Sequence, residues 1–169
     1  MGDGGKKVSD ISYSTDKHGF SYRAAGILLH DGRVLLQMHD GEYAFPGSGV
    51  AFGETTAETL IREFAEEIGE DTIEVAELKW VWENFYVWNN TPYHQICIYH
   101  LLKLKDNAHI PLSDKFIHKE YSENDANPVW FYWVPVDELN NISVHPKNAA
   151  ELLRRIDEGV LHFAYREGE

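Results

Sequence analysis

Residues 48–70 read SGVAFGETTAETLIREFAEEIGE, and this stretch decides the fold. It predicts a glycine-containing loop followed by a helix over residues 55–68. Thr55 can cap this helix, and Glu58 three residues later completes a capping box. Gly69 follows the predicted last residue and suits the left-handed conformation that often ends a helix. The helical period places one set of apolar side chains on a common face: Leu60, Ile61, Phe64, Ala65 and Ile68.

The opposite face of this predicted helix carries Glu63, Glu66 and Glu67. Their spacing stacks three carboxylates within about one turn, where like charges destabilise a helix. They also lie toward the negative end of the helix dipole, which disfavours anions. A hard divalent cation such as Mg²⁺, which takes oxygen ligands and also binds substrate phosphates, would compensate. The alternative is a solvated acidic face that pairs in part with Arg62.

The whole stretch resembles the Nudix box, in which a glycine, a glutamate and an Arg-Glu-apolar-any-Glu-Glu segment recur at fixed spacing. Seven of nine specified positions match: Glu54, Arg62, Glu63, Phe64, Glu66, Glu67 and Gly69. At six of these positions the box allows a single residue type, so a match by chance is on the order of one in ten million per starting position in a sequence. Ser48 stands where the box has its first glycine, and Glu70 stands where it has its last apolar residue.

The resemblance implies a Nudix hydrolase, with an αβα sandwich around a mixed sheet. Such enzymes use water to cleave a diphosphate linked to a further moiety, with Mg²⁺ or Mn²⁺ holding the phosphates. By position, Glu63, Glu66 and Glu67 would ligate metal, and the Ser48 carbonyl would be a further ligand. Arg62 and Glu54 would orient these carboxylates through hydrogen bonds. Among carboxylates before the closing strand, Glu120 is the first choice as general base.

Periodicity and turn residues outline the other elements. Strands are expected at residues 22–29, 34–38, 73–88, 94–104 and 129–134, with an Asp31-Gly32 turn after the first. Residues 45–49 are expected to form a loop, because Pro46 and two glycines interrupt the chain there. A terminal helix is expected at residues 147–158. Strands and helices mix without regular alternation, which indicates an α+β or mixed-sheet layered class.

Composition limits the classes of protein that this chain can be. Lys and Arg number 15 against 28 Asp and Glu, a net charge of −13. This acidic balance argues against a nucleic-acid or anionic-membrane binder, since both need a basic surface. The one cysteine, Cys97, cannot form an internal disulfide, which fits the cytoplasm. Residues 1–17 are expected to be a loose tail, and residues 18–169 a single catalytic domain.

Trp80, Trp82, Tyr86 and Trp88 alternate along one predicted strand, with Asn84 between them. Such a row can stack a nucleobase, fill a core, or form the interface of a homodimer, which we favour. Overall the sequence predicts a cytoplasmic, Mg²⁺-dependent pyrophosphohydrolase acting on a small-molecule nucleotide. The favoured substrate is a nucleoside diphosphate linked to X, such as a nucleotide sugar or ADP-ribose. The alternatives are a nucleoside triphosphate, cleaved to sanitise the nucleotide pool, and a non-catalytic nucleotide-binding module.

Overall fold

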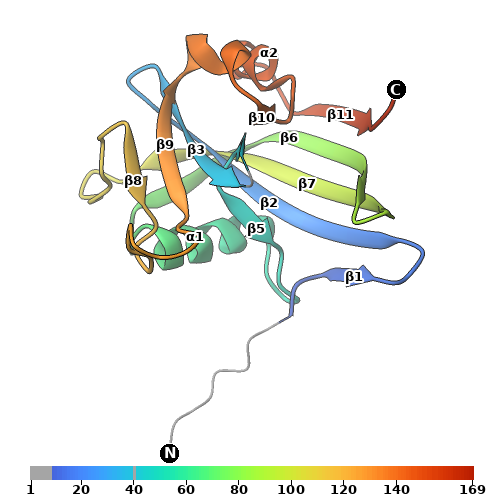
Figure 1. Cartoon of the computed structure of the whole chain (residues 1–169). Coiled ribbons are helices and arrows are strands. Elements are labelled where there is room, and N and C mark those ends of the chain that lie inside the picture. The colour runs from blue at the N-terminus through green and yellow to red at the C-terminus, as the bar shows by residue number, and fades with distance from the viewer. Residues whose placement is uncertain (1–8, 40) are drawn as a thin grey trace, which may run out of the picture.

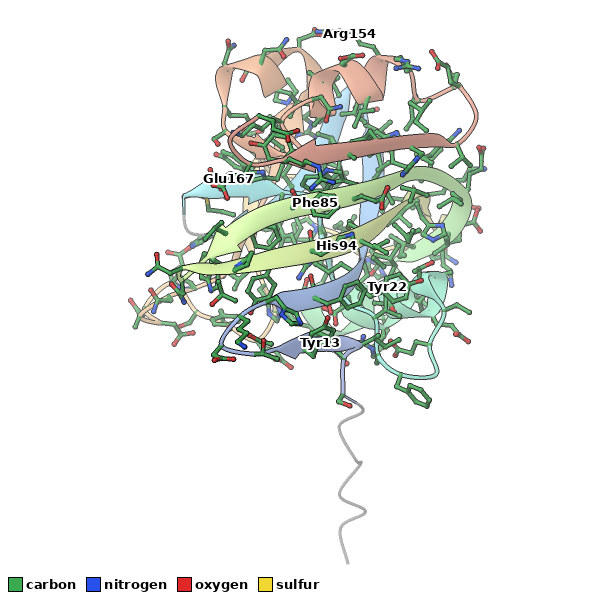
Figure 2. The ribbon with its side chains drawn as sticks, turned by 90° about the vertical axis from the view of Figure 1, so that its right-hand side faces the viewer. Tyr13, Tyr22, Phe85, His94, Arg154 and Glu167 are labelled. Atoms are coloured by element: carbon green, nitrogen blue, oxygen red, sulfur yellow. The ribbon has the colours of Figure 1, made fainter. Side chains whose placement is uncertain are left out.

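A mixed sheet with a helix-bearing layer on each face forms the molecule, as seen in a computed structural model that describes residues 9–39 and 41–169 (Figure 1). Its centre is the antiparallel hairpin of β6 (Ile73–Trp88) and β7 (Thr91–Leu104). β2 (Gly19–His30) pairs in parallel with β7, and β11 (Leu161–Arg166) pairs in parallel with β6. Figure 2 shows β11, β6, β7, β2 and β1 (Ser12–Ser14) in this order.

The sheet continues past β2 into β3 (Arg33–His39), β4 (Glu42–Ala44) and β10 (Val144–His145). Three further strands branch from this path: β5 (Gly47–Gly49) pairs with β2, β9 (Trp130–Pro135) with β3, and β8 (Lys115–Ile117) with β9. The helical segments are α1 (Thr56–Glu67), the 3₁₀ turn η1 (Val136–Asn141) and α2 (Ala149–Arg154). No helix in residues 9–39 or 41–169 is long and apolar enough to cross a membrane.

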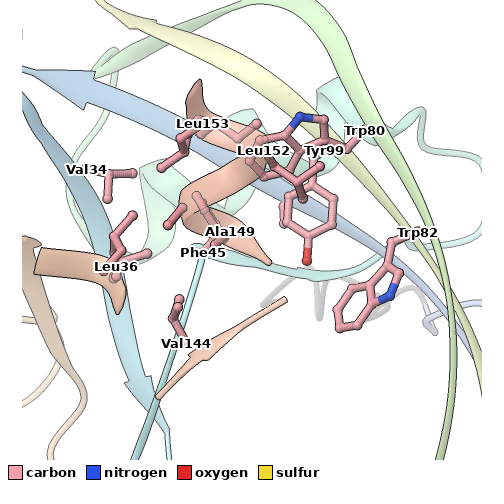
Figure 3. Close-up of a cluster of buried hydrophobic side chains, with 14 of the residues drawn as sticks. Val34, Leu36, Phe45, Trp80, Trp82, Tyr99, Val144, Ala149, Leu152 and Leu153 are labelled. Carbon is pink, nitrogen blue, oxygen red and sulfur yellow. The ribbon is translucent and has the colours of Figure 1, made fainter. Parts of the chain in front are cut away.

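Two buried clusters lie on the two faces of the sheet. On one face Leu60 and Phe64 of α1 pack against Leu28 and Phe131. On the other, Trp80 and Phe45 pack beneath α2 and η1, and their rings meet edge to face at 5.5 Å (Figure 3). Because both faces of the sheet are covered, the layered mixed-sheet class predicted from the sequence is confirmed.

Two tight turns follow directly from local sequence. Asp31 and Gly32 have φ of 48° and 73° between β2 and β3. Asn89 and Asn90 have φ of 48° and 61° between β6 and β7. These left-handed pairs match the twist of the strands that they join, and Asn, Asp and Gly tolerate the conformation best. The hairpin at residues 31–32 is therefore as expected.

Several elements differ from the prediction. Residues 47–49 form β5 and not a loop, because β2 supplies a pairing partner across the chain. The terminal helix stops at Arg154, where the chain turns to enter β11, a strand that the sequence analysis did not anticipate. Lys79 holds this turn by donating to the Glu158 carbonyl, 3.3 Å away. Of the expected tail, residues 1–8 lie outside the described residues, while β1 is paired with β2.

Candidate active site

Helix α1 is fixed at its first turn by the predicted capping box. The Glu58 amide donates to Thr55 Oγ1 at 3.2 Å, and the Thr55 amide donates to Glu58 Oε2 at 2.8 Å. Its other end differs from the prediction. Gly69 is not left-handed: its N–H donates to the Phe64 carbonyl at 2.9 Å, and the left-handed residue is Asp71, with φ of 52°. The helix therefore ends on a widened turn closed by an i→i−5 hydrogen bond, and the left-handed residue comes two positions later than expected.

The two faces of α1 also differ from those predicted. Ile61 is 51% exposed, whereas Glu63 is only 8% exposed. Glu63 is accommodated because its carboxylate pairs with the guanidinium of Arg62, the next residue back. A buried carboxylate is tolerated when it is paired and hydrogen-bonded. The acidic side of the helix is thus turned partly toward the interior of the protein.

Arg62 lies at the centre of a group of carboxylates. Its Nε is 2.7 Å from Glu54 Oε1, and its Nη2 is 3.0 Å from Glu54 Oε2, a bidentate pair. Its Nη1 contacts Glu63 and lies 3.5 Å from Glu66 Oε2. Hydrogen bonding to Arg62 lowers the pKa of Glu54 to about 2. The structure therefore brings together four of the predicted site residues: Glu54, Arg62, Glu63 and Glu66.

Glu67, the third carboxylate of the predicted metal set, faces a more enclosed environment. Burial, followed by the neighbouring Glu63 carboxylate, raises the pKa of Glu67 to about 7. A hydrogen bond from Gln37 acts in the opposite direction. His118 Nε2 lies 3.8 Å from Glu67 Oε1. Besides burial, the Glu63 and Glu66 carboxylates contribute to this raised pKa, and a bound cation would relieve their repulsion.

Strand β5 lies alongside α1 and carries Ser48. Ser48 pairs opposite Ala24 of β2 and is not among the residues of positive φ, so the missing glycine imposes no backbone conflict. Gly47 is the position that cannot carry a side chain. A Cβ there would lie 2.0 Å from the Ala24 carbonyl oxygen. The close approach of β5 to β2 thus depends on Gly47.

The segment around Glu120 is held against the end of α1. The Lys119 amide donates to the Glu67 carbonyl at 2.9 Å, and the Glu120 amide donates to His118 Nδ1 at 3.1 Å. The Glu120 side chain itself is exposed. His118 is not among the predicted site residues, because it lies in a polar stretch without periodicity. The signal that the sequence offers is its spacing of two from Phe116, and the structure buries both side chains.

The donor set of this site fits a hard divalent cation. Three carboxylates of one helix lie beside β5, and hard cations prefer oxygen ligands. Among residues 9–39 and 41–169, no three acidic, His or Cys side chains already converge on one point. Arg62 accounts for this, since it draws Glu63 and Glu66 to its own guanidinium.

A cleft of about 500 Å³ opens on the face of the sheet opposite α1. Arg23 lines this cleft and donates to the Gly47 carbonyl of β5 at 3.2 Å, and its charge lowers the pKa of Glu67. The floor of the cleft is formed by β2, β7 and β6, and one wall by β11. Other lining residues are His145 of β10 and Lys147, which follows two residues later.

The aromatic row of β6 divides between core and cleft. Trp80 and Trp82 are 1% and 5% exposed and belong to the buried cluster (Figure 3). Tyr86 and Trp88 line the cleft, and Trp88 is 55% exposed. The expectation that the whole row forms a dimer interface is therefore wrong for its inner half, which fills the space beneath α2.

Comparison with known proteins places this geometry in a family. Residues 21–156 match the model of the NUDIX domain. The chain belongs to the Nudix family. It is a Nudix hydrolase, and Nudix hydrolases generally use divalent metal ions. No curated protein in the comparison matches the chain.

Solved Nudix structures share the fold at low sequence identity. A UDP-X diphosphatase aligns with a TM-score of 0.57 and 18% identity over 89% of this chain and 68% of that one. An ADP-ribose pyrophosphatase from Streptococcus suis 89-1591 gives 0.53 and 15%, over 86% and 98%. The C. elegans Ap4A hydrolase gives 0.53 and 20%, over 80% and 95%. At these identities the likeness establishes the fold.

Proposed function

We propose that this Nudix hydrolase cleaves a nucleoside diphosphate linked to a further moiety X, with Mg²⁺ or Mn²⁺. One observation carries the proposal: β5 lies beside α1 and its carboxylates, and the Gly47 carbonyl of β5 accepts from Arg23, which lines a cleft of about 500 Å³. A diphosphate held at the carboxylates would leave the cleft free for the rest of the substrate. Residues 18–169 would act as one catalytic domain.

Each residue of the group has a proposed task. Glu63, Glu66 and Glu67 would hold the metal, and the Ser48 carbonyl would be a further ligand. The metal, when bound, neutralises phosphate charge and acidifies water. Arg62 and Glu54 are positioning residues, because Glu54 fixes the guanidinium that in turn contacts Glu63 and Glu66. Arg23 would face a phosphate oxygen, as guanidinium groups often do.

The proposed reaction is attack of water on phosphorus. An oxygen–phosphorus bond forms, the bond from phosphorus to the bridging oxygen breaks, and the base takes the proton of the water. We assign this base to Glu120. The support for this assignment is that its two preceding residues contact the end of α1: the Lys119 amide donates to the Glu67 carbonyl, and His118 Nε2 lies 3.8 Å from Glu67 Oε1.

A product assay with Mg²⁺ tests the function. Its panel holds a nucleotide sugar, ADP-ribose, a dinucleoside tetraphosphate and nucleoside triphosphates. Cleavage within the diphosphate of an X-linked substrate is the expected result. Release of pyrophosphate from triphosphates alone would instead favour the sanitising activity, and turnover of nothing in the panel would favour a non-catalytic binding module.

Glu67→Gln is the matched variant for this assay, with Glu70→Gln as its control. Both changes remove one carboxylate near the end of α1, but Glu70 is exposed and outside the proposed metal set. We expect Glu67→Gln to abolish metal-dependent turnover and Glu70→Gln to keep it. Wild-type turnover in Glu67→Gln at saturating Mg²⁺ would contradict the metal assignment. The cytoplasmic location and the homodimer stay predictions, and light scattering measures the second.

A further inference from the structure

The cleft wall contains two buried polar atoms that have no hydrogen-bond partner among the described residues. They are the indole Nε1 of Trp82 and the amide Oδ1 of Asn84. Buried polar groups are normally satisfied, and an exception calls for an explanation. Both belong to β6 and point to the same face of the sheet, since they are two residues apart. A third such atom, His94 Nε2, lies outside the residues that line the cleft, so Trp82 and Asn84 are the two that face it.

Of the two residues, Asn84 is the one that a bound molecule can reach. Trp82 is 5% exposed, whereas Asn84 is half-buried. The χ2 torsion of asparagine, which rotates the carboxamide about the Cβ–Cγ bond, has a broad energy profile. Among the described residues no hydrogen bond holds the Asn84 Oδ1, so this amide is free to turn toward the cleft. Its cross-strand neighbour Gln95 is already committed, because its Nε2 donates to Ser21 Oγ at 3.0 Å.

The surroundings of Asn84 indicate what kind of group it would meet. Tyr86 and Trp88 follow on the same face of β6 and line the cleft, and aromatic faces of this kind stack planar rings. A carboxamide offers one acceptor and two donors, so it can bond to a ring edge that presents both a donor and an acceptor. The charged groups here are largely paired: Glu42 lies 2.6 Å from His145 Nε2, and Glu167 accepts from the Val87 amide at 2.7 Å.

We infer that Asn84 is a specificity-determining residue, which reads the donor–acceptor edge of a nucleobase that stacks on Tyr86 and Trp88. The inference rests on the proposed function, and it places the nucleoside part of the substrate in the cleft. Arg23 lines the same cleft and donates to the Gly47 carbonyl of β5, the strand beside α1, whose carboxylates would hold the phosphates. The base would thereby be recognised by β6, whereas the proposed metal ligand Ser48 belongs to β5.

Binding of metal-free nucleoside monophosphates tests this inference without turnover. The probes are UMP, AMP, GMP and CMP, with ribose 5-phosphate as the probe that lacks a base, all measured by calorimetry. We expect the wild type to bind at least one nucleotide tighter than ribose 5-phosphate. Asn84→Leu should reduce that preference by about three- to tenfold, the equivalent of one net hydrogen bond. Its affinity for ribose 5-phosphate should not change, whereas a purely structural defect would weaken both probes.

Two further variants sharpen the test. Asn84→Asp keeps the shape of the side chain but cannot donate, so it should also lower the preference for the base. Glu83→Gln is the control, because Glu83 points to the other face of β6, where it lies 2.7 Å from His162 Nε2. Glu83→Gln should bind every probe as the wild type does. A wild-type preference in both Asn84 variants, or no preference for a base in the wild type, would overturn the inference.

The outcome also separates this inference from the proposed function. Turnover of X-linked diphosphates with an unchanged base preference in the Asn84 variants would refute the role of Asn84 alone. Loss of base preference in those variants, in a protein that hydrolyses nothing in the panel, would support the base site and refute the hydrolytic function.

Discussion

At the scale of single residues, Arg62 organises the candidate active site. Its guanidinium forks to both oxygens of Glu54 and reaches Glu63 and Glu66 with its remaining nitrogen. We expect Arg62→Ala to lower kcat/KM by about 10- to 100-fold, as is usual for residues that orient metal ligands. Arg62→Lys should fall between Ala and wild type, because an ammonium group keeps the charge but cannot fork.

Steady-state kinetics rank these Arg62 variants, and circular dichroism checks that both are folded. If both variants keep wild-type activity, the charge and the geometry of Arg62 are both irrelevant to the reaction, and the positioning role must be abandoned.

Glu54 makes the stability of the protein sensitive to acid. Its pKa is about 2 in the folded protein, against 4.5 for an ordinary glutamate, because Arg62 donates to the ionised form. A lowered folded-state pKa contributes stability above the unfolded value, which is lost as the pH falls from about 4.5 toward 2. The contribution is on the order of 1–2 kcal/mol, since solvent screens part of the pair.

Glu54→Gln should therefore be less stable than the wild type at pH 7, and the difference should shrink toward pH 2. Urea unfolding across this pH range measures it. A difference between the two proteins that stays constant with pH would show that ionisation of Glu54 does not stabilise the fold. Glu58→Gln is a useful comparison, since Glu58 belongs to the helix cap and not to the Arg62 group.

At the scale of elements, the position of β5 depends on a single glycine. A Cβ at Gly47 would meet the backbone of Ala24, whereas one at Gly49 would meet only the end of the Asp10 side chain, which can move. We expect Gly47→Ala to destabilise the protein by about 1–3 kcal/mol, the usual cost of overpacking. It should also displace Ser48 and so lower activity.

Gly49→Ala is the matched control, because it makes the same substitution two residues along the same strand. Thermal unfolding and turnover are measured for both. A Gly47→Ala protein that is as stable and as active as Gly49→Ala would show that β5 tolerates separation from β2.

The same elements show what could be predicted from the sequence. Helix α1 carries its own signals, the capping box and the apolar spacing, and its first residue is correct to one position. The long hairpin of β6 and β7 is encoded by its alternation and its Asn-Asn turn. Strands β5 and β11 are not encoded locally. β5 is three residues interrupted by glycine, and β11 exists because β6 offers a free edge far earlier in the chain.

In the candidate site too, locally encoded features could be predicted and features that depend on tertiary packing could not. The positions of Glu54, Arg62, Glu63 and Glu66 could be predicted, because they are separated by fixed steps along one loop and one helix. The burial of Glu63 and the contact of Glu67 with His118 could not, since both depend on neighbours brought in by tertiary packing. Asn84 gave no signal of its own, because its lack of a partner is visible only in three dimensions.

At the scale of the whole molecule, the crowded carboxylates predict a stability that depends on metal. Glu63 and Glu67 repel each other until a cation is bound, and a ligand that binds only the folded state stabilises it. At a metal concentration of one hundred times Kd the gain is about 2.7 kcal/mol. For a chain of this size that corresponds to a rise in Tm of roughly 5–10 °C.

Melting curves in EDTA and in millimolar Mg²⁺ measure this shift, and Glu63→Gln should reduce it. Glu70→Gln, which removes an exposed charge, should retain the full shift. A wild-type Tm that is indifferent to Mg²⁺, with and without a nucleotide present, would favour a merely solvated acidic face.

Strand β11 has a consequence for how such a protein can change over time. It borders the cleft through Tyr165, and among the described strands it pairs with β6 alone. Helix α1 and its carboxylates lie on the opposite face of the sheet. Mutations in β11 could then change which substrate the enzyme accepts, while the catalytic residues on α1 stay unchanged. Among descendants of a common ancestor, we expect the last strand to diverge fastest.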